Sequence, residues 1–193
     1  MPILGIIASA ISGNLFAPSG AYDSIATTTV GSGGSASITF SSIPATYTHL
    51  QIRLLSKSTN TSATDDGIYF TFNGDTTAKY TRHFLYGTGS SAGSGGASVL
   101  QTFMSLGDTT TQGNGANFFG VTIADILDYA NTNKYKTGRG LGGYDANGSG
   151  INWFASGSWQ NTAAITSVTM TMVGGTYNFA QYSHAALYGI KGA

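Results

Sequence analysis

Three histidines, His49, His83 and His184, are the residues best suited to acid–base chemistry. One Gly-x-Ser-x-Gly match, Gly89–Gly93, offers a serine that could act as a nucleophile. A hydrolase triad needs Ser, His and Asp side chains that converge in space, and a nucleophile elbow lies on a tight turn between a strand and a helix. The match lies in a Gly/Ser-rich run with no helix pattern after it. It therefore indicates a loop, and we predict no catalytic residue there.

Metal coordination and glycoside hydrolysis both require several functional side chains that lie close together in space. A zinc site usually includes two ligands at short spacing, but the three histidines are far apart in the sequence and show no such spacing. The alternative is a trimer in which one histidine from each subunit meets on the axis. Asp65 and Asp66 are adjacent and point to opposite faces if the segment is extended. The chain has no glutamate. We expect no metal site, no cofactor and no paired-carboxylate chemistry, and we interpret the histidines as surface side chains.

Two glycine-rich runs imitate ligand-binding motifs. Asp145–Gly150 has the alternating oxygen ligands of a calcium loop, but its twelfth position is Ser156 where a bidentate Glu is needed. Gly138–Gly143 follows a predicted strand, and no helix N-terminus is predicted there to hold a phosphate. We interpret the first run as a polar turn. Five aromatic residues could stack on sugars, although most are expected in the core: Trp153, Phe154, Trp159, Tyr177 and Tyr182.

The composition is that of a neutral, sparsely charged globular chain. It has 193 residues, 28 of them glycine, with 8% charged and 41% hydrophobic residues and a formal net charge of zero. A nucleic-acid partner calls for a basic patch, so zero net charge argues against one. The absence of cysteine excludes disulfides and thiolate chemistry. Low charge lowers the solubility of a lone monomer, which favours a component of an assembly.

The N-terminal segment is apolar and carries no charged side chain. Its large apolar residues are Ile3, Leu4, Ile6, Ile7, Ile11, Leu15 and Phe16. A signal peptide would have a basic n-region, which is missing here, and the run is too short and interrupted to span a bilayer. We predict that residues 1–21 form an arm that docks on a neighbouring subunit. The alternative is a segment folded onto its own domain.

From Tyr22 onward the sequence alternates apolar and polar residues with a period of two, which is typical of half-buried strands. Leu50, Ile52 and Leu54 are the predicted inward residues of one strand. Polar loops are predicted over 56–66, 87–96 and 108–117. The pattern predicts strands over 25–30, 35–40, 48–54, 68–72, 80–86, 99–106, 151–159, 164–173 and 179–190. Residues 22–193 are therefore predicted to form one all-β domain, an antiparallel two-sheet sandwich of the jelly-roll type.

Residues 118–141 hold five charged residues and are predicted to form a β-hairpin around a turn at 131–133. One register would place three complementary pairs across the two strands. These pairs are Tyr129 with Tyr135, Asp128 with Lys136, and Asp125 with Arg139. A short helix over 118–130 is the alternative, but Gly, Val, Thr and Ile at its start are poor helix formers.

Several segments together resemble small structural proteins of tailed bacteriophages. They are Thr48–Arg53, Phe72–Asp75, Asp125–Lys134, Trp159–Ser167, Phe179–Ser183 and Ala186–Gly192. The resemblance covers nearly the whole chain. It implies a jelly-roll trimer like those of capsid decoration proteins and fibre head domains, and it supplies no catalytic residue.

These observations lead to an expected function in a virion. We expect a capsid decoration, or cement, protein that binds the major capsid protein as a homotrimer on the capsid surface, with the N-terminal arm as its contact. The alternative is a tail or head-fibre component that binds a host surface glycan. An enzyme is disfavoured, and neither a nucleic acid nor a membrane is an expected partner.

Overall fold

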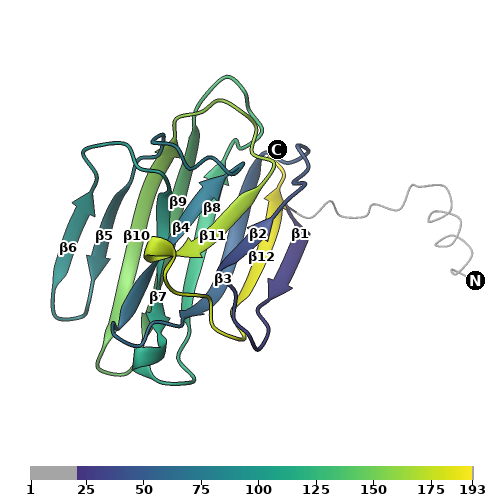
Figure 1. Cartoon of the computed structure of the whole chain (residues 1–193). Coiled ribbons are helices and arrows are strands. Elements are labelled where there is room, and N and C mark those ends of the chain that lie inside the picture. The colour runs from purple at the N-terminus through teal and green to yellow at the C-terminus, as the bar shows by residue number, and fades with distance from the viewer. Residues whose placement is uncertain (1–20, 193) are drawn as a thin grey trace, which may run out of the picture.

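The computed structural model describes residues 21–192, which form a nearly all-β fold (Figure 1). Within these residues there are twelve strands: β1 (Tyr22–Thr29), β2 (Ser37–Phe40), β3 (His49–Ser58), β4 (Asp65–Phe72), β5 (His83–Gly87), β6 (Ala92–Gly96), β7 (Met104–Thr111), β8 (Gly120–Leu127), β9 (Lys136–Asp145), β10 (Gly150–Trp159), β11 (Val168–Met172) and β12 (His184–Ile190). Two short 3-10 helices, η1 (Gln112–Asn114) and η2 (Val173–Gly175), follow β7 and β11. The predicted interface residues of the arm, from Ile3 to Phe16, lie outside the described residues.

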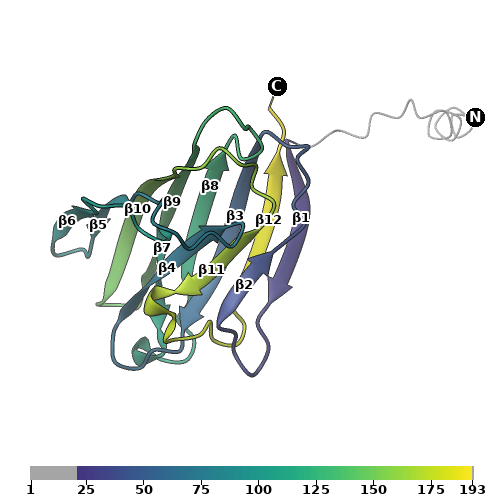
Figure 2. The same cartoon turned by 45° about the horizontal axis from the view of Figure 1, so that its top comes forward.

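The strands are arranged in two layers. The larger layer has the order β6-β5-β10-β9-β8-β3-β12-β1, and the smaller one has the order β2-β11-β4-β7. The two join where the end of β3 pairs in parallel with β7, at Lys57 and Ser58. Figure 2 shows β4 and β11 lying across the strands of the larger layer, with the β5–β6 hairpin extending beyond them. The predicted all-β, sandwich-like fold is confirmed at this level.

The core forms because both layers turn one apolar face inward. In β3, Leu50, Ile52 and Leu54 are at most 1% exposed, as the alternation predicted. They meet the inward residues of β4 and β11, which include Phe70 and Met170. Each such side chain contributes about 1.5–3 kcal/mol when it leaves water. The period-two pattern therefore identifies the core correctly.

Glycines let the two layers approach closely around β7. Gly138 and Gly140 alternate along the inner face of β9, opposite Met104 and Leu106 of β7. A β-carbon at position 138 would lie 2.6 Å from the Met104 sulfur, and one at 140 would overlap the Leu106 carbonyl oxygen. The glycine-rich run in β9 is thus a packing device inside the sandwich, which is consistent with the rejection of a phosphate loop.

Two predicted loops are partly strands. Part of the Gly/Ser run over 87–96 forms β6, and its Gly93 and Gly95 lie directly against the rings of Tyr86 and Phe84. The predicted loop over 108–117 begins with four residues of β7, from Asp108 to Thr111, all of which are buried. Small or polar residues can occupy strands where a neighbouring ring or hydroxyl complements them, and the binary pattern alone cannot reveal this.

The predicted hairpin exists as β8 and β9, and it is antiparallel. Asp125 and Arg139 are paired across the strands as predicted. Their side chains do not meet, however: the Asp125 carboxylate accepts a hydrogen bond of 2.8 Å from the Gln51 amide, and the Arg139 guanidinium lies 6.0 Å from the centre of the Phe154 ring. The register was right, but the expected ion pair is replaced by other partners.

The predicted Asp128–Lys136 pair is wrong. Asp128 has a φ of 50°, which turns the chain out of the sheet just after β8 ends. Its carboxylate pairs with Lys134 and lies 3.7 Å from the His49 ring. Lys136 is fully buried, and its ammonium donates to the backbone carbonyls of Asn131, Lys134 and Thr162. An eight-residue connection over 128–135 therefore replaces the short turn.

The predicted Tyr129–Tyr135 pair is also wrong. Tyr129 is fully buried and its hydroxyl donates to the Pro44 carbonyl, whereas Tyr135 is 55% exposed. The cause is the same: the strands end before these residues, so cross-strand geometry no longer applies to them. A hydroxyl that reaches a backbone carbonyl allows Tyr129 to enter the core.

Candidate binding surface

The outer face of the larger layer carries a row of exposed apolar side chains. The strand register places Leu85 of β5 opposite Phe154 of β10, Phe154 opposite Leu141 of β9, and Leu141 opposite Ile123 of β8. Leu85, Phe154 and Leu141 are 58%, 44% and 57% exposed. We call these four residues the apolar row.

Two further side chains widen the apolar row. Val121 precedes Ile123 by two positions on β8 and is 51% exposed. Leu55 of β3 is paired with Val121 and is 46% exposed. Scattered apolar residues are normal on a protein surface, but a contiguous set marks an interaction site or an aggregation liability.

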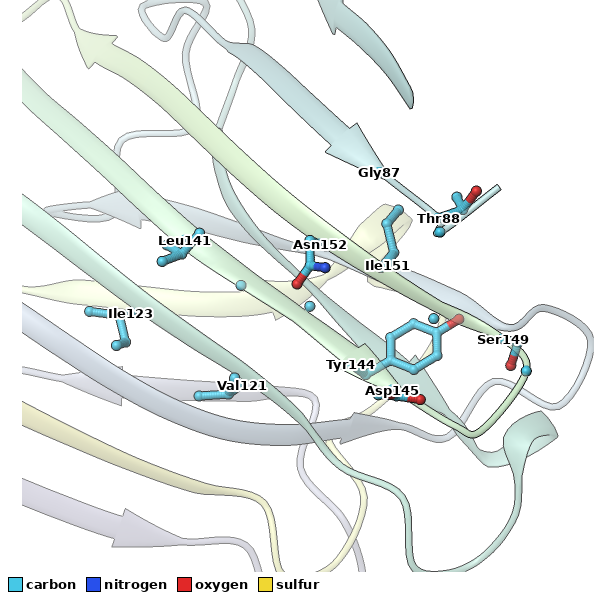
Figure 3. A pocket seen from close by; sticks show the side chains of 15 residues that line it. Gly87, Thr88, Val121, Ile123, Leu141, Tyr144, Asp145, Ser149, Ile151 and Asn152 are labelled. Carbon is cyan, nitrogen blue, oxygen red and sulfur yellow. The ribbon is translucent and has the colours of Figure 1, made fainter. Parts of the chain in front are cut away.

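A groove of about 620 Å³ runs beside the apolar row (Figure 3). Val121, Ile123 and Leu141 line one side, and Asn152 projects from β10 on the other. Its floor is bare because Gly143 lies between Val121 and Asn152 in the register. Gly143 has a φ of 139° and a β-carbon there would overlap the Ile151 carbonyl oxygen, so no side chain can fill the groove.

A second groove of about 390 Å³ lies on the opposite side of Phe154. Leu85, Phe154, Arg139, Ser156 and His83 are among its lining residues. The Arg139 guanidinium over the Phe154 ring is the charged group in this lining, and cation–π contacts of this kind are typical of interfaces. Leu141 lines the first groove and Phe154 the second, and the register places these two residues opposite each other.

The structure does not bring the candidate catalytic residues together. His49 and His184 belong to the paired strands β3 and β12, but His49 is opposite Ile190, six residues from His184. Six residues of a strand span about 20 Å. The His49 ring accepts from the Asp128 amide at 3.0 Å, and the His184 ring shares a 2.8 Å hydrogen bond with Thr29. His83 lines the second groove.

The other sequence motifs have structural roles. Gly89–Gly93 spans the turn of the β5–β6 hairpin, where Thr88 and Ser91 hydrogen-bond to each other. The Asp145 carboxylate accepts from the Asn147 amide at 2.9 Å, which closes the β9–β10 turn. In the described part of the chain, no group of three or more histidines and acidic residues could hold a metal ion. Residues 21–192 also contain no helix long and apolar enough to cross a membrane.

The aromatic residues divide into core and surface groups. Trp159 is buried and its indole donates to Asp75 at 2.9 Å, and Trp153 stacks on Phe84 with ring centres 4.1 Å apart. Phe154 and Tyr182 are 44% and 66% exposed. Core packing was predicted for most of the five aromatic residues, but only Trp159 belongs to the buried core, with Tyr177 packed partly buried against it. The two exposed rings both lie beside grooves.

Two buried carboxylates lie away from these surfaces on neighbouring strands, Asp66 on β4 and Asp108 on β7. Asp108 is 4% exposed, and one of its oxygens has no hydrogen-bond partner within residues 21–192. Burial, with smaller contributions from Asp65 and Asp66, raises the pKa of Asp108 to about 8. Burial also raises the pKa of Asp66, although its 2.6 Å hydrogen bond from Ser58 opposes the shift. Asp65 is exposed while Asp66 is buried, as expected for adjacent strand residues.

Reasoning from the sequence missed the apolar row. The only signal for it was that β8 carries apolar residues on both faces, with Val121 and Ile123 outward and Ala124 and Ile126 inward. A strand that is apolar on both sides is covered on both sides or exposes one of them. The sequence does not indicate whether the outward face of β8 is covered or exposed, because this depends on the register across four strands.

Comparison of the chain with protein-family models, curated proteins and solved structures gives no match.

Proposed function

We propose that this chain is a non-enzymatic structural protein of a tailed-phage virion. In this proposal it is a capsid decoration protein of the jelly-roll type that binds the major capsid protein as a homotrimer on the capsid surface. The observation that carries the proposal is the apolar row, because a contiguous set of exposed apolar side chains favours burial against another subunit. The low charge of the chain and the resemblance of its segments to phage structural proteins support the same role.

The apolar row would contribute to assembly through burial of surface. Stable protein–protein interfaces bury about 1,200–2,000 Å² in total, with an apolar centre and a polar rim. Leu141 and Phe154 would lie at such a centre, while Arg139 and Asn152 would lie at its rim. Cement proteins of this kind act mechanically, because each contact across a seam between capsomers adds buried apolar area at about 25 cal/mol per Å².

A second candidate function is a tail or head-fibre component that binds a host surface glycan. The observation that favours it is Tyr182, whose ring is 66% exposed beside a groove at the end of the sandwich. The two candidates differ in copy number, because decoration requires many copies over the shell and a fibre only a few. Gel densitometry of purified virions against the major capsid protein distinguishes them.

A binding experiment with a matched control tests the first candidate. Phage heads lacking the protein are mixed with wild-type protein, with Leu141→Asp and with Thr137→Asp, and are then sedimented. Thr137 is exposed on the same face of β9 but lies outside the apolar row. We expect wild type and Thr137→Asp to co-sediment at a fixed ratio to the capsid protein, and Leu141→Asp to bind at least tenfold more weakly. Equal binding of Leu141→Asp, or no binding of wild type, contradicts the proposal.

The oligomeric state is tested separately by light scattering coupled to gel filtration. The homotrimer predicts three times the chain mass of 19.8 kDa at concentrations well above micromolar. A monomer under those conditions contradicts the trimer.

A further inference from the structure

A third groove, of about 470 Å³, lies at the end of the sandwich where β3 ends, away from the apolar row. Three separate loops build it: the segment after β3, the segment around η1, and the turn before β12. Its lining residues include Lys57, Thr61, Gln112, Phe119, Gln181 and Tyr182.

Tyr182 stands in this groove with an unfavourable backbone conformation. The amide of Ser183 donates to the Ala180 carbonyl at 3.1 Å, so Tyr182 is the third residue of a four-residue turn. Its φ is 71°, in the left-handed region where such turns strongly favour glycine or asparagine. A bulky residue with positive φ is an outlier, and outliers of this kind gather at functional sites.

Burial of the Tyr182 ring does not offset this strain. The residue is 66% exposed, the second most exposed of the large hydrophobic side chains in the described chain. Its amide donates to the Val30 carbonyl at 3.0 Å, but any residue could make this backbone contact. The Tyr182 side chain therefore contributes little to the stability of the fold. Stability does not explain why an exposed aromatic ring occupies this position.

The chemistry of the lining favours a neutral, polar ligand with a flat apolar face. Gln112 and Gln181 provide amide donors and acceptors, and Thr61 provides a hydroxyl. Phe119 adds a second aromatic ring. Among the residues that the structure describes, the lining contains no carboxylate. Rings of this kind stack on the C–H faces of hexoses, while amides hydrogen-bond to the hydroxyl groups.

Lys57, the one cation that residues 21–192 contribute to this groove, is already engaged. The Lys57 ammonium donates to the carbonyls of Gly115 and Ala116 at 2.8 and 2.5 Å and lies 5.4 Å from the centre of the Phe119 ring. Burial lowers the pKa of Lys57, which further weakens it as an anchor for an anion. An acidic ligand would thus find no free positive charge from this residue.

We propose that this groove binds a neutral or N-acetylated oligosaccharide, with Tyr182 as the stacking platform and Gln112 and Gln181 as hydrogen-bonding residues. The proposal rests on the second candidate function, whose glycan it assigns to this groove, and it does not depend on the function proposed for the apolar row. In this proposal the groove binds a sugar chain of a few residues, and the outer face of the larger layer binds a protein partner.

The test uses full-length protein with two probes, chitotetraose and maltotetraose, in saturation-transfer NMR and titration calorimetry. We expect at least one probe to bind wild type, Tyr182→Phe to bind within about threefold of wild type, and Tyr182→Gly to bind at least tenfold more weakly. Tyr135→Gly is the matched control, because Tyr135 is also an exposed tyrosine but lies in the β8–β9 connection. It should bind as wild type does.

Thermal melting separates loss of the ring from loss of the fold. Glycine accepts the positive φ at position 182, so Tyr182→Gly should melt at a higher temperature than wild type while it loses the sugar. Gln112→Ala, which leaves the turn intact, should also weaken binding, by at least threefold. The proposal is overturned if neither probe binds wild type at millimolar concentration, or if Tyr182→Gly binds as tightly as wild type.

Discussion

The two faces of β9 differ in how much of their surface is buried in the folded protein. On the inner face, Gly138 and Gly140 are covered so closely by β7 that no side chain fits. On the outer face, Leu141 is 57% exposed and Arg139 extends over Phe154. Adjacent residues of one strand thus have different environments. Those on the inner face are packed against β7, and those on the outer face are exposed to solvent. Substitutions on β9 should therefore act on stability or on binding according to their face.

The largest effect is expected from Gly140→Val. The new side chain would overlap the backbone of Leu106, which cannot move without separating the two layers. We expect a loss of more than about 4 kcal/mol in the free energy of unfolding, or failure to fold. Leu141→Ser, one residue away on the outer face, should change stability by less than about 1 kcal/mol. Urea denaturation of both variants measures the difference, and similar losses would contradict the assignment of the faces.

The two cations of β9 should also differ in their effect on stability, because Lys136 is buried and Arg139 is exposed. Lys136→Met removes the donor for three backbone carbonyls in the connection over 128–135 and at Thr162. Because buried acceptors without partners are costly, we expect a loss of about 2–4 kcal/mol. Arg139→Met on the outer face should lose less than about 1 kcal/mol. Equal losses in urea denaturation would show that the Lys136 contacts do not stabilise the connection.

A smaller effect concerns pH and the buried Asp108 of β7. The pKa of Asp108 is about 8 in the folded protein against an ordinary 3.8. Between these pH values the folded state holds a proton that the unfolded chain has released, so this residue makes the free energy of unfolding fall as pH rises. Asp108→Asn removes that fall and should raise stability at pH 7 by about 1–3 kcal/mol.

Urea denaturation from pH 4 to pH 8 measures this slope. Asp145→Asn is the control, because Asp145 is exposed in the β9–β10 turn. The control should keep the wild-type slope. A wild-type slope in Asp108→Asn would show that Asp108 is ionised in the folded protein at neutral pH.

Much of the fold could be predicted because most strands follow the period-two pattern. Leu50, Ile52 and Leu54 show the pattern clearly, and they are buried as predicted. The end of β7 could not be predicted, because Thr109 and Thr111 are polar. Each is buried through a bond from its hydroxyl, Thr109 to the Ser56 carbonyl and Thr111 to the Ala63 carbonyl. Such partners are distant in sequence and become visible only in the folded chain.

The candidate surfaces were less accessible to prediction than the fold. The arm was chosen because apolar residues are contiguous in it, whereas the apolar row is assembled from four strands by their register. Tyr182 was one of five aromatic residues of interest, but its positive φ and its groove depend on the turn before β12. The Asp128–Lys136 pair fails because Asp128 leaves the sheet with a positive φ. The Asp125–Arg139 pair keeps its register, but Gln51 and Phe154 are the side-chain partners instead.

The central claim, that the apolar row is buried against a virion subunit, can be measured through cysteine labelling. The chain has no cysteine, so a single Leu141→Cys variant reports on the row alone. Val173→Cys, at an exposed position after β11 in the smaller layer, is the control. Maleimide labelling is followed for the free protein and for protein bound to phage heads. We expect the heads to slow labelling at position 141 at least tenfold and to leave position 173 unchanged, whereas equal labelling of Leu141→Cys in both states would contradict the claim.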